Sequence, residues 1–310
     1  VAATERARPG LRAGLAAVPP SLDPQLASGT IFSGVVVDLF AGLVTRDAGS
    51  RPSPGCAESW SVSEDRLTWT FRLREGLQWS DGTPLVAEDF AWSFRRLLEA
   101  RTASPLAGQV FVIRNPREGI AGKLPPADLG VEAPDPRTVV IRLAQPVPYF
   151  LDLLTILSVA PVPRHAIERH GADWTKAGNF VGNGAFTLVS RQPQGPIRLA
   201  KNPRFYDAAA VRIDELSYEP TPDLNTALQR YRAGELDMIQ SFAPEQLDRL
   251  RAEMPDAVHL VQQAGTNFVA LNLRRKPLDD VRVRQALFLA VDREGIAGKV
   301  LRSGTQPAWS

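Results

Sequence analysis

Histidines are the first residues to test for metal binding or acid–base chemistry in this chain. There are three, His165, His170 and His259, and the first two are five positions apart. That spacing does not bring two side chains to one face of a helix. No HExxH or CxxC motif accompanies them. The sequence therefore predicts no metal site, and we expect no cofactor.

Nucleophiles and paired carboxylates are equally sparse. The single cysteine, Cys56, has no adjacent basic residue that would lower its pKa, which favours a small buried thiol. Glu58 and Asp81 lie in polar loops, where a carboxylate more often accepts cap or turn hydrogen bonds than acts in catalysis. The GxSxG, Walker A and GxGxxG motifs are absent. We therefore expect a protein that is not an enzyme.

The composition is that of an ordinary globular protein, and the chain is long enough for two domains or more. The chain has 310 residues, of which 44% are hydrophobic and 23% charged, and its net charge is +2. That charge is spread along the chain, which argues against a nucleic-acid partner. No apolar run is long enough for a transmembrane helix. The chain starts at Val1 without a charged-then-apolar leader, so either a signal peptide has been removed or the chain was shortened.

The clearest local pattern is a strand, a turn and a helix. Alternating apolar residues predict a strand at 67–73. Residues 80–84 predict a turn, because Gly supplies a positive φ and Pro cannot continue a ladder. Residues 85–98 then predict a helix with one apolar face and two acidic residues at its positive end. These elements are a scaffold and contain no catalytic constellation.

The rest of the chain interleaves helices and strands. Helices are expected at 30–43, 147–154, 225–233, 244–251 and 281–291. Strands are expected at 138–143, 185–190, 197–200, 213–218, 235–239 and 268–273. Residues 45–60 are expected to form a loop rich in Gly, Pro and Ser. The fold class is therefore α/β or mixed α+β.

Six short motifs, in a fixed order from about residue 20 onward, resemble those of one family. They are SLDP at 21–24, PGCAESW at 54–60, WSDGTP at 79–84, NGAF at 183–186, YRAGELD at 231–237 and DVRVRQAL at 280–287. Together they resemble the extracytoplasmic solute-binding proteins of peptide ABC transporters, family 5. The strongest resemblance is to the oligopeptide- and murein-peptide-binding branch.

The resemblance implies a two-lobed, periplasmic-binding-protein-like fold that closes on a peptide. The first lobe would comprise residues 1–40 and 165–264, with an extra domain inserted at 41–164. Residues 265–310 would begin a second lobe that is incomplete. Family members run well beyond this length, so we expect a fragment, a shortened form or an unusually short homologue. A peptide held from one side only would bind weakly or undetectably.

The resemblance also implies a set of ligand-binding residues. In oligopeptide-binding members, the segment a few residues after Asp-Pro hydrogen-bonds to the peptide backbone, and here that segment is Ser28, Gly29 and Thr30. Leu106 stands where well-studied members have an aromatic residue near the amino end of the peptide. The segment 266–272 resembles the crossover between lobes, and it supplies Thr266, Asn267 and Phe268. Ala270 stands where some oligopeptide binders have an acidic residue.

The function that this resemblance implies is binding extended peptides and delivering them to an ABC transporter permease. The mature protein would be periplasmic after removal of its signal peptide. Two alternatives stay open. The same fold could bind a nickel chelate, haem, a sugar or an opine. A non-transport sensory or interaction module could also retain mainly the first lobe.

Overall fold

The computed structural model describes residues 10–27, 29, 33–115, 129–260, 266, 268–302 and 305–308. It divides into two units, Val1–Gln240 and Ser241–Ser310. Strands and helices are interleaved along the first unit, as the mixed α/β expectation requires. Within the described residues, none of the helices combines the length and the apolar character that crossing a bilayer requires.

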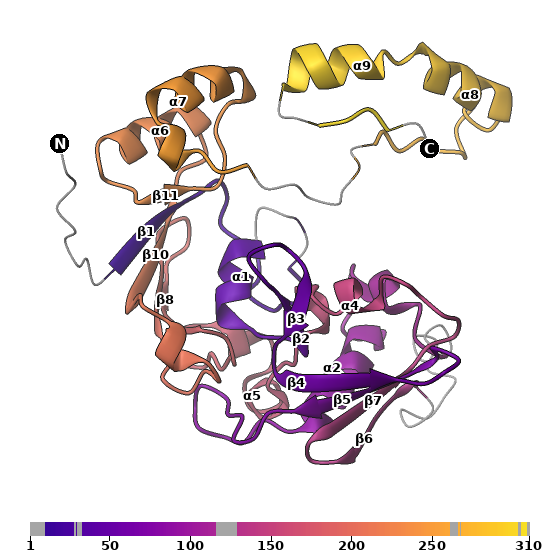
Figure 1. Cartoon of the computed structure of the whole chain (residues 1–310), viewed down its shortest axis with the longest axis vertical. Helices are drawn as coiled ribbons and strands as arrows, with labels where there is room; N and C mark the ends of the chain where they lie inside the picture. The colour runs from indigo at the N-terminus through magenta and orange to yellow at the C-terminus, as the bar shows by residue number, and fades with distance from the viewer. Residues whose placement is uncertain are drawn as a thin grey trace. The chain divides into compact units, whose positions relative to one another are not determined.

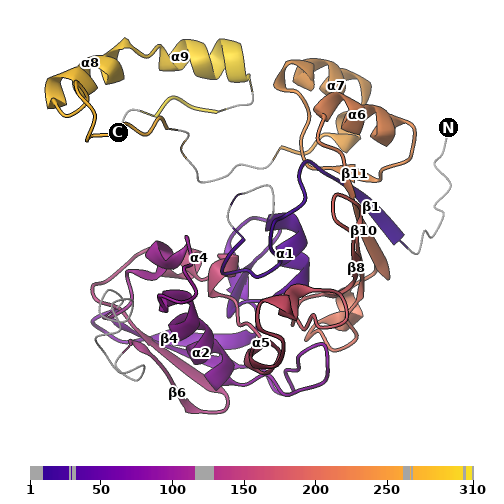
Figure 2. The ribbon, with the colours of Figure 1, turned by 180° about the vertical axis from the view of Figure 1, so that it is seen from behind.

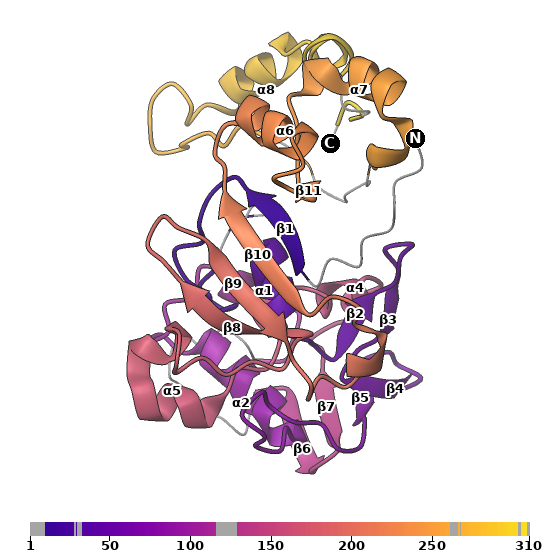
Figure 3. The same ribbon diagram turned by 90° about the vertical axis from the view of Figure 1, so that its left-hand side faces the viewer.

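A five-stranded sheet forms one half of the first unit (Figures 1 and 3). Its order is β11 (Met238–Ile239), β1 (Gly10–Leu15), β10 (Glu215–Pro220), β9 (Ile197–Lys201) and β8 (Phe186–Arg191). β1 runs parallel to β10 and β11, whereas β10, β9 and β8 are antiparallel neighbours. Helix α1 (Ser33–Leu39) lies against this sheet beside β8 and buries Val35, Val36 and Leu39.

A four-stranded antiparallel sheet forms the other half (Figure 2). Its order is β4 (Ala57–Val62), β5 (Thr68–Leu73), β7 (Thr138–Arg142) and β6 (Val131–Asp135). Helix α2 (Ala87–Leu98) packs on it, contacting β6 and β7. The apolar face of α2 is fully buried, and each buried Phe or Leu side chain contributes about 1.5–3 kcal/mol. A short hairpin, β2 (Val44–Arg46) and β3 (Pro52–Pro54), stands beside this sheet.

Each sheet has its own hydrophobic core. The core over the four-stranded sheet, called here the first core, includes Phe71, Trp79, Phe90 and Phe94. The core over the five-stranded sheet, the second core, includes Leu15, Leu39, Trp174 and Tyr218. The other helices in the described residues of this unit are η2 (Ala107–Val110), α4 (Phe150–Leu153), η4 (Leu157–Val159), α5 (Arg164–His170), η5 (Gly171–Thr175), η6 (Ala208–Ala210) and α6 (Leu224–Arg232).

The second unit consists of short helical segments. They are η7 (Pro244–Gln246), α7 (Leu247–Glu253), η8 (Pro255–Ala257), α8 (Val281–Ala290), α9 (Arg293–Gly295) and the π-helical segment η9 (Ile296–Leu301). α7 buries Leu247 and Leu250. α8 buries none of its ten residues, all of which the structure describes.

Most of the expected elements are confirmed. β5, α2, β7, β8, β9, β10, α6 and α8 each fall on a predicted segment. α6 ends where expected, because Gly234 adopts a φ of +72° just beyond it. The turn at residues 80–84 is present, with Gly82 at a φ of +92°. α1 and α4 are shorter than the helices predicted at 30–43 and 147–154, and β11 is shorter than the predicted strand 235–239.

Two predictions are wrong. Residues 45–60 are not a loop throughout, because β3 and most of β4 lie there and pair with β2 and β5. Residues 268–273 form no strand. A strand needs a neighbour for its N–H and C=O groups, and in the described part of the second unit no segment is a strand. The division into lobe, inserted domain and second lobe stays a prediction.

Candidate functional site

The predicted ligand-binding residues fall in both units. Ser28, Thr30 and Asn267 lie outside the described residues. Gly29 is exposed and has a φ of +111°, a conformation that strains any residue with a Cβ. In the second unit Thr266 is exposed, and Phe268 is 82% exposed.

Leu106 lies at the edge of the first core. It is partly buried and packs against the first core, immediately before the 3-10 turn η2. Its main-chain N–H donates to Ser104 Oγ at 3.1 Å. Whether its side chain contacts a ligand stays a prediction.

The segment that leads to Gly29 is held by a compact turn. Asp23 O accepts hydrogen bonds from the N–H groups of Leu26 and Ala27 at 3.0 and 2.9 Å. Asp23 Oδ1 accepts from Gln25 N at 2.9 Å, the short-range bond that an aspartate before proline favours. Asp23 and Gln25 are 1% and 0% exposed. The chain therefore reaches Ala27 from a fixed, buried turn.

This turn is tied to α2 by a buried ion pair. Arg96 Nη2 lies 2.7 Å from Asp23 Oδ2, and the two side chains are 12% and 2% exposed. A carboxylate so deeply buried needs a cation to offset its lost hydration. The Asp23–Arg96 ion pair was not predicted from the sequence. One sequence feature could have indicated the pair. Ser93 and Arg96 are two polar residues, three positions apart, beside the apolar stripe of the predicted helix.

A second carboxylate, Asp38, lies partly buried on α1. Asp38 Oδ2 accepts a hydrogen bond of 2.6 Å from the hydroxyl of Tyr218 on β10. Burial raises the pKa of Asp38 to about 6, although the Tyr218 hydroxyl acts in the opposite direction. Next to it, Gly184 N donates to Leu39 O at 3.0 Å. A Cβ on Gly184 would lie 2.4 Å from Asp38 O, so only glycine permits this approach.

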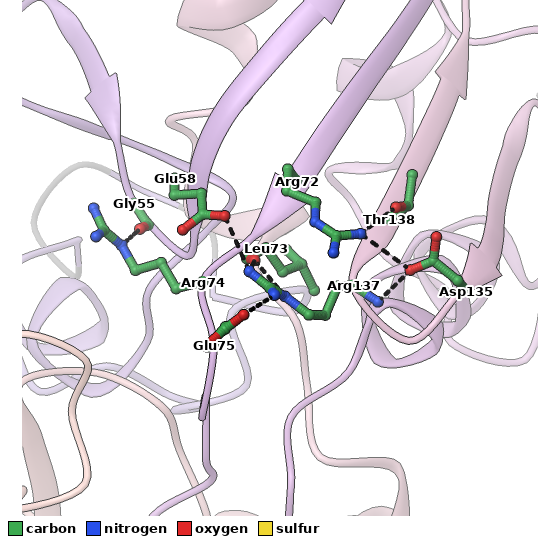
Figure 4. Close-up of polar contacts among 9 residues, drawn as sticks. All are labelled: Gly55, Glu58, Arg72, Leu73, Arg74, Glu75, Asp135, Arg137 and Thr138. Atoms are coloured by element: carbon green, nitrogen blue, oxygen red, sulfur yellow. Dashed lines mark hydrogen bonds and ion pairs between the residues drawn. The ribbon is translucent and has the colours of Figure 1, made fainter.

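Glu58, a carboxylate considered for catalysis, has a structural role (Figure 4). It lies 3.0 Å from Arg137 Nη2. Arg137 also pairs with Glu75, and it donates to Leu73 O from Nε at 3.1 Å and from Nη2 at 2.9 Å. Arg72 makes a neighbouring contact with Asp135 at 3.6 Å (Figure 4). These half-exposed ion pairs join β4, β5 and the β6–β7 turn, and each contributes about 0–1 kcal/mol.

Asp81 and Cys56 are also engaged by the fold. Asp81 Oδ2 lies 2.8 Å from His165 Nε2, and Asp81 Oδ1 accepts from Thr83 N at 2.9 Å. Partial burial acts to raise the pKa of Asp81, but the hydrogen bonds from Thr83 and His165 hold it below its ordinary value. Burial raises the pKa of the Cys56 thiol to about 12, so it is protonated and inert.

Possible metal ligands do not gather in the described residues. No group of three or more His, Cys, Asp or Glu side chains there is arranged to hold a metal ion. The polar contacts described above build and join chain segments of the first unit. What the described geometry offers is an exposed glycine after a firmly held turn, together with exposed residues in the second unit.

Comparison with known proteins identifies the family. The family model described as "Bacterial extracellular solute-binding proteins, family 5 Middle" matches residues 51–310. The chain belongs to this family. It is 43% identical over 293 residues to the periplasmic oligopeptide-binding protein OppA of Salmonella typhimurium, covering 94% of this chain and 54% of that protein.

The names of two further similar proteins state what those proteins bind. The probable deoxycholate-binding periplasmic protein YgiS of Escherichia coli is 39% identical over 285 residues, covering 91% of this chain and 53% of that protein. The structure of Haemophilus influenzae OppA in complex with RPPGFSPFR superposes with a TM-score of 0.89 and 36% identity. That match covers 97% of this chain and 60% of that chain. The chain thus spans about half the length of the curated relatives it matches.

Proposed function

We propose that this chain is part of a receptor that binds extended peptides and delivers them to an ABC transporter permease. The observation that carries the proposal is its similarity, over 97% of its length, to a protein solved with a bound peptide. Both curated relatives named above are described as binding proteins, which supports a function without catalysis. Both are also described as periplasmic, which supports an extracytoplasmic location for the mature protein.

The proposed peptide contacts are mainly to the backbone. Ser28, Gly29 and Thr30 would pair with an extended peptide, because main-chain hydrogen bonds ignore the identity of the peptide's side chains. The exposure of Gly29 supports this role. Leu106 would lie near the amino end of the peptide, and Thr266, Asn267 and Phe268 are proposed as further ligand-binding residues.

The proposed domain division has support from the two cores. The second core draws on residues between Ala13 and Phe40, on Ala160 and Val162, and on residues between Trp174 and Tyr218, whereas the first core is built mainly from residues 43–159. An inserted domain at 41–164 would need such a core of its own. Ala166 and Val181 belong to the first core, so the proposed boundary near 164 is crossed by a few packing contacts.

A non-peptide ligand is the second candidate, and a specific similarity favours it. YgiS, the probable deoxycholate-binding protein, resembles this chain almost as closely in identity as the Salmonella OppA does. Backbone pairing would then have no partner, because a steroid offers no repeating N–H and C=O groups. The ligand would instead need a mainly apolar pocket with a few polar groups.

The two candidates differ in what the purified protein carries. The complete gene product would be isolated from its native host, denatured, and its released ligands identified by mass spectrometry. We expect a mixture of peptides that differ in sequence. Recovery of one uniform non-peptide species would overturn the peptide proposal and favour the alternative.

A further inference from the structure

A set of buried and partly buried polar side chains joins the turn that leads to Gly29 with α2 and with the loop before Leu106. We call Asp23, Gln25, Ser93, Arg96 and Ser104 the polar hub. Asp23, Gln25 and Ser93 are 0–1% exposed. Such groups add little net stability even when fully bonded, and apolar replacements of equal volume are often as stable. Stability alone is therefore a weak account of the polar hub.

Gln25 is the centre of the polar hub. Its Nε2 donates to Ser93 O on α2 at 2.7 Å, and its Oε1 accepts from Arg96 Nη1 at 2.5 Å. Its main-chain O accepts from Ser104 Oγ at 2.5 Å. Ser93 Oγ in turn accepts from Val162 N at 2.8 Å. One residue of the turn is thus fixed to α2 and to the loop that contains Ser104.

Ser104 connects the turn to Leu106. The same hydroxyl that donates to Gln25 O accepts from Leu106 N at 3.1 Å. Gln25 stands four residues before Gly29. The Ser104 side chain therefore links Gln25, in the turn that leads to Gly29, with Leu106, the residue proposed to lie near the peptide's amino end.

We infer that the polar hub is a positioning device for ligand binding, with Ser104 and Gln25 as positioning residues. It fixes the position of Ala27 relative to Leu106. The segment proposed to pair with the peptide backbone continues from Ala27. Affinity then depends on the polar hub because pre-organised binding groups lose less conformational entropy when the ligand arrives. The inference rests on the proposed function and adds to it the residues that set the site's geometry.

Ser104→Ala is the most direct test, with Ser63→Ala as a matched control. Ser63 Oγ likewise donates once, to Asp65 at 2.5 Å, and accepts once from a main-chain N–H, that of Thr68 at 2.9 Å. It lies in the β4–β5 turn, away from the polar hub. In the complete gene product, we expect Ser104→Ala to weaken affinity for a peptide recovered with the wild type by about fivefold. We expect Ser63→Ala to leave that affinity unchanged.

Two further variants separate positioning from simple destabilisation. Ser104→Thr keeps the hydroxyl and is expected to restore wild-type affinity. Arg96→Lys keeps the charge beside Asp23, but one ammonium does not reproduce the fork that spans Asp23 and Gln25. We expect it to weaken affinity, whereas Arg95→Lys, at the partly exposed pair with Glu88, is expected not to.

Amide hydrogen exchange in the absence of ligand measures directly how firmly the turn before Gly29 and the loop at Leu106 are held. We expect Ser104→Ala to speed exchange in peptic fragments covering residues 24–33 and 104–110, and Ser63→Ala to speed it only around the β4–β5 turn. Equal affinities for the Ser104→Ala and Ser63→Ala proteins would overturn the inference. If the wild-type protein binds no peptide, the proposed function fails instead, and exchange unchanged at 24–33 would then overturn the positioning claim as well.

Discussion

Helices α2 and α8 show how differently the two units use similar residues. In α2, Phe90, Phe94 and Leu97 are at most 1% exposed. In α8, Leu287 and Leu289 are 44% and 79% exposed. α2 has a single apolar stripe that matches the face it buries.

The apolar residues of α8 surround the helix instead. Residues 286–290 are all apolar, a pattern typical of a helix that is buried on several sides. The described residues give α8 no such cover. Periodicity and capping thus decide whether a segment is helical, while burial depends on partners elsewhere. The first unit supplies those partners to α2, so we expect it to unfold as a cooperative body.

The largest expected difference is between two leucine-to-alanine substitutions. Leu97→Ala removes a buried side chain of the first core and should lower the free energy of unfolding by about 2–5 kcal/mol. Leu289→Ala removes an exposed one and should change it by less than about 0.5 kcal/mol. Urea unfolding followed by tryptophan fluorescence measures this, because five of the six tryptophans lie in the first unit. Equal decreases in the free energy of unfolding for the two variants would contradict the proposed difference between α2 and α8.

Elements with local sequence signals could be predicted, whereas elements that depend on distant partners could not. The strand, turn and helix at 67–98 were predictable because their signals lie within a few residues of one another. β1 was missed because Gly10–Leu15 becomes a strand by pairing with β10, some two hundred residues later. The strand expected at 268–273 had the right residue types but no neighbour in the described residues. Propensity alone cannot supply a pairing partner.

The candidate site was predictable to a smaller extent. The family, and the segment around Gly29, followed from short motifs. The polar hub did not, because Gln25 and Arg96 are 71 residues apart and each alone resembles an ordinary surface residue. Leu106 was placed beside the ligand by resemblance, whereas its described contacts are with the first core. Long-range polar contacts leave little trace in a single sequence.

A smaller effect is expected from Asp38, the partly buried carboxylate on α1. The pKa of Asp38 is raised to about 6 in the fold, above the ordinary value of 3.8. Its contribution to stability is therefore fully present below about pH 4 and is lost as the pH rises through about 6. Asp38→Asn keeps an acceptor for Tyr218 and should raise the free energy of unfolding at pH 7 by on the order of 2 kcal/mol.

The pH dependence distinguishes this effect from a general gain in packing. The advantage of Asp38→Asn over wild type should shrink as the pH falls from 7 to 4, in urea unfolding at each pH. Asp223 supplies the control, since hydrogen bonds from Thr226 lower its pKa and its contribution is lost as the pH falls. An advantage of Asp38→Asn that stays constant with pH would contradict a raised pKa.

The smallest expected effects concern the two helix starts. The N-cap residue of α2, Val86, makes no side-chain cap hydrogen bond, while Asp89 accepts from Val86 N at 2.9 Å. Val86→Thr should add about 1 kcal/mol to the stability of the first unit. α8 has a cap, since Asp280 accepts from Arg282 N at 2.9 Å.

Asp280→Ala completes the comparison of helix starts. It should reduce the helical signal in circular dichroism without moving the tryptophan transition, because the cap stabilises a helix outside the two cores. A shift of that transition by as much as Val86→Thr produces would show that α8 unfolds together with the first unit.

The central claim, recognition of a peptide through its backbone, has one direct test. Calorimetry on the complete gene product would compare a peptide found with the protein, a version with one side chain truncated to alanine, and a version with one backbone nitrogen methylated. N-methylation removes a main-chain donor, so we expect it to weaken binding by about tenfold, while truncation changes affinity by less than about threefold. The reverse order would contradict the account.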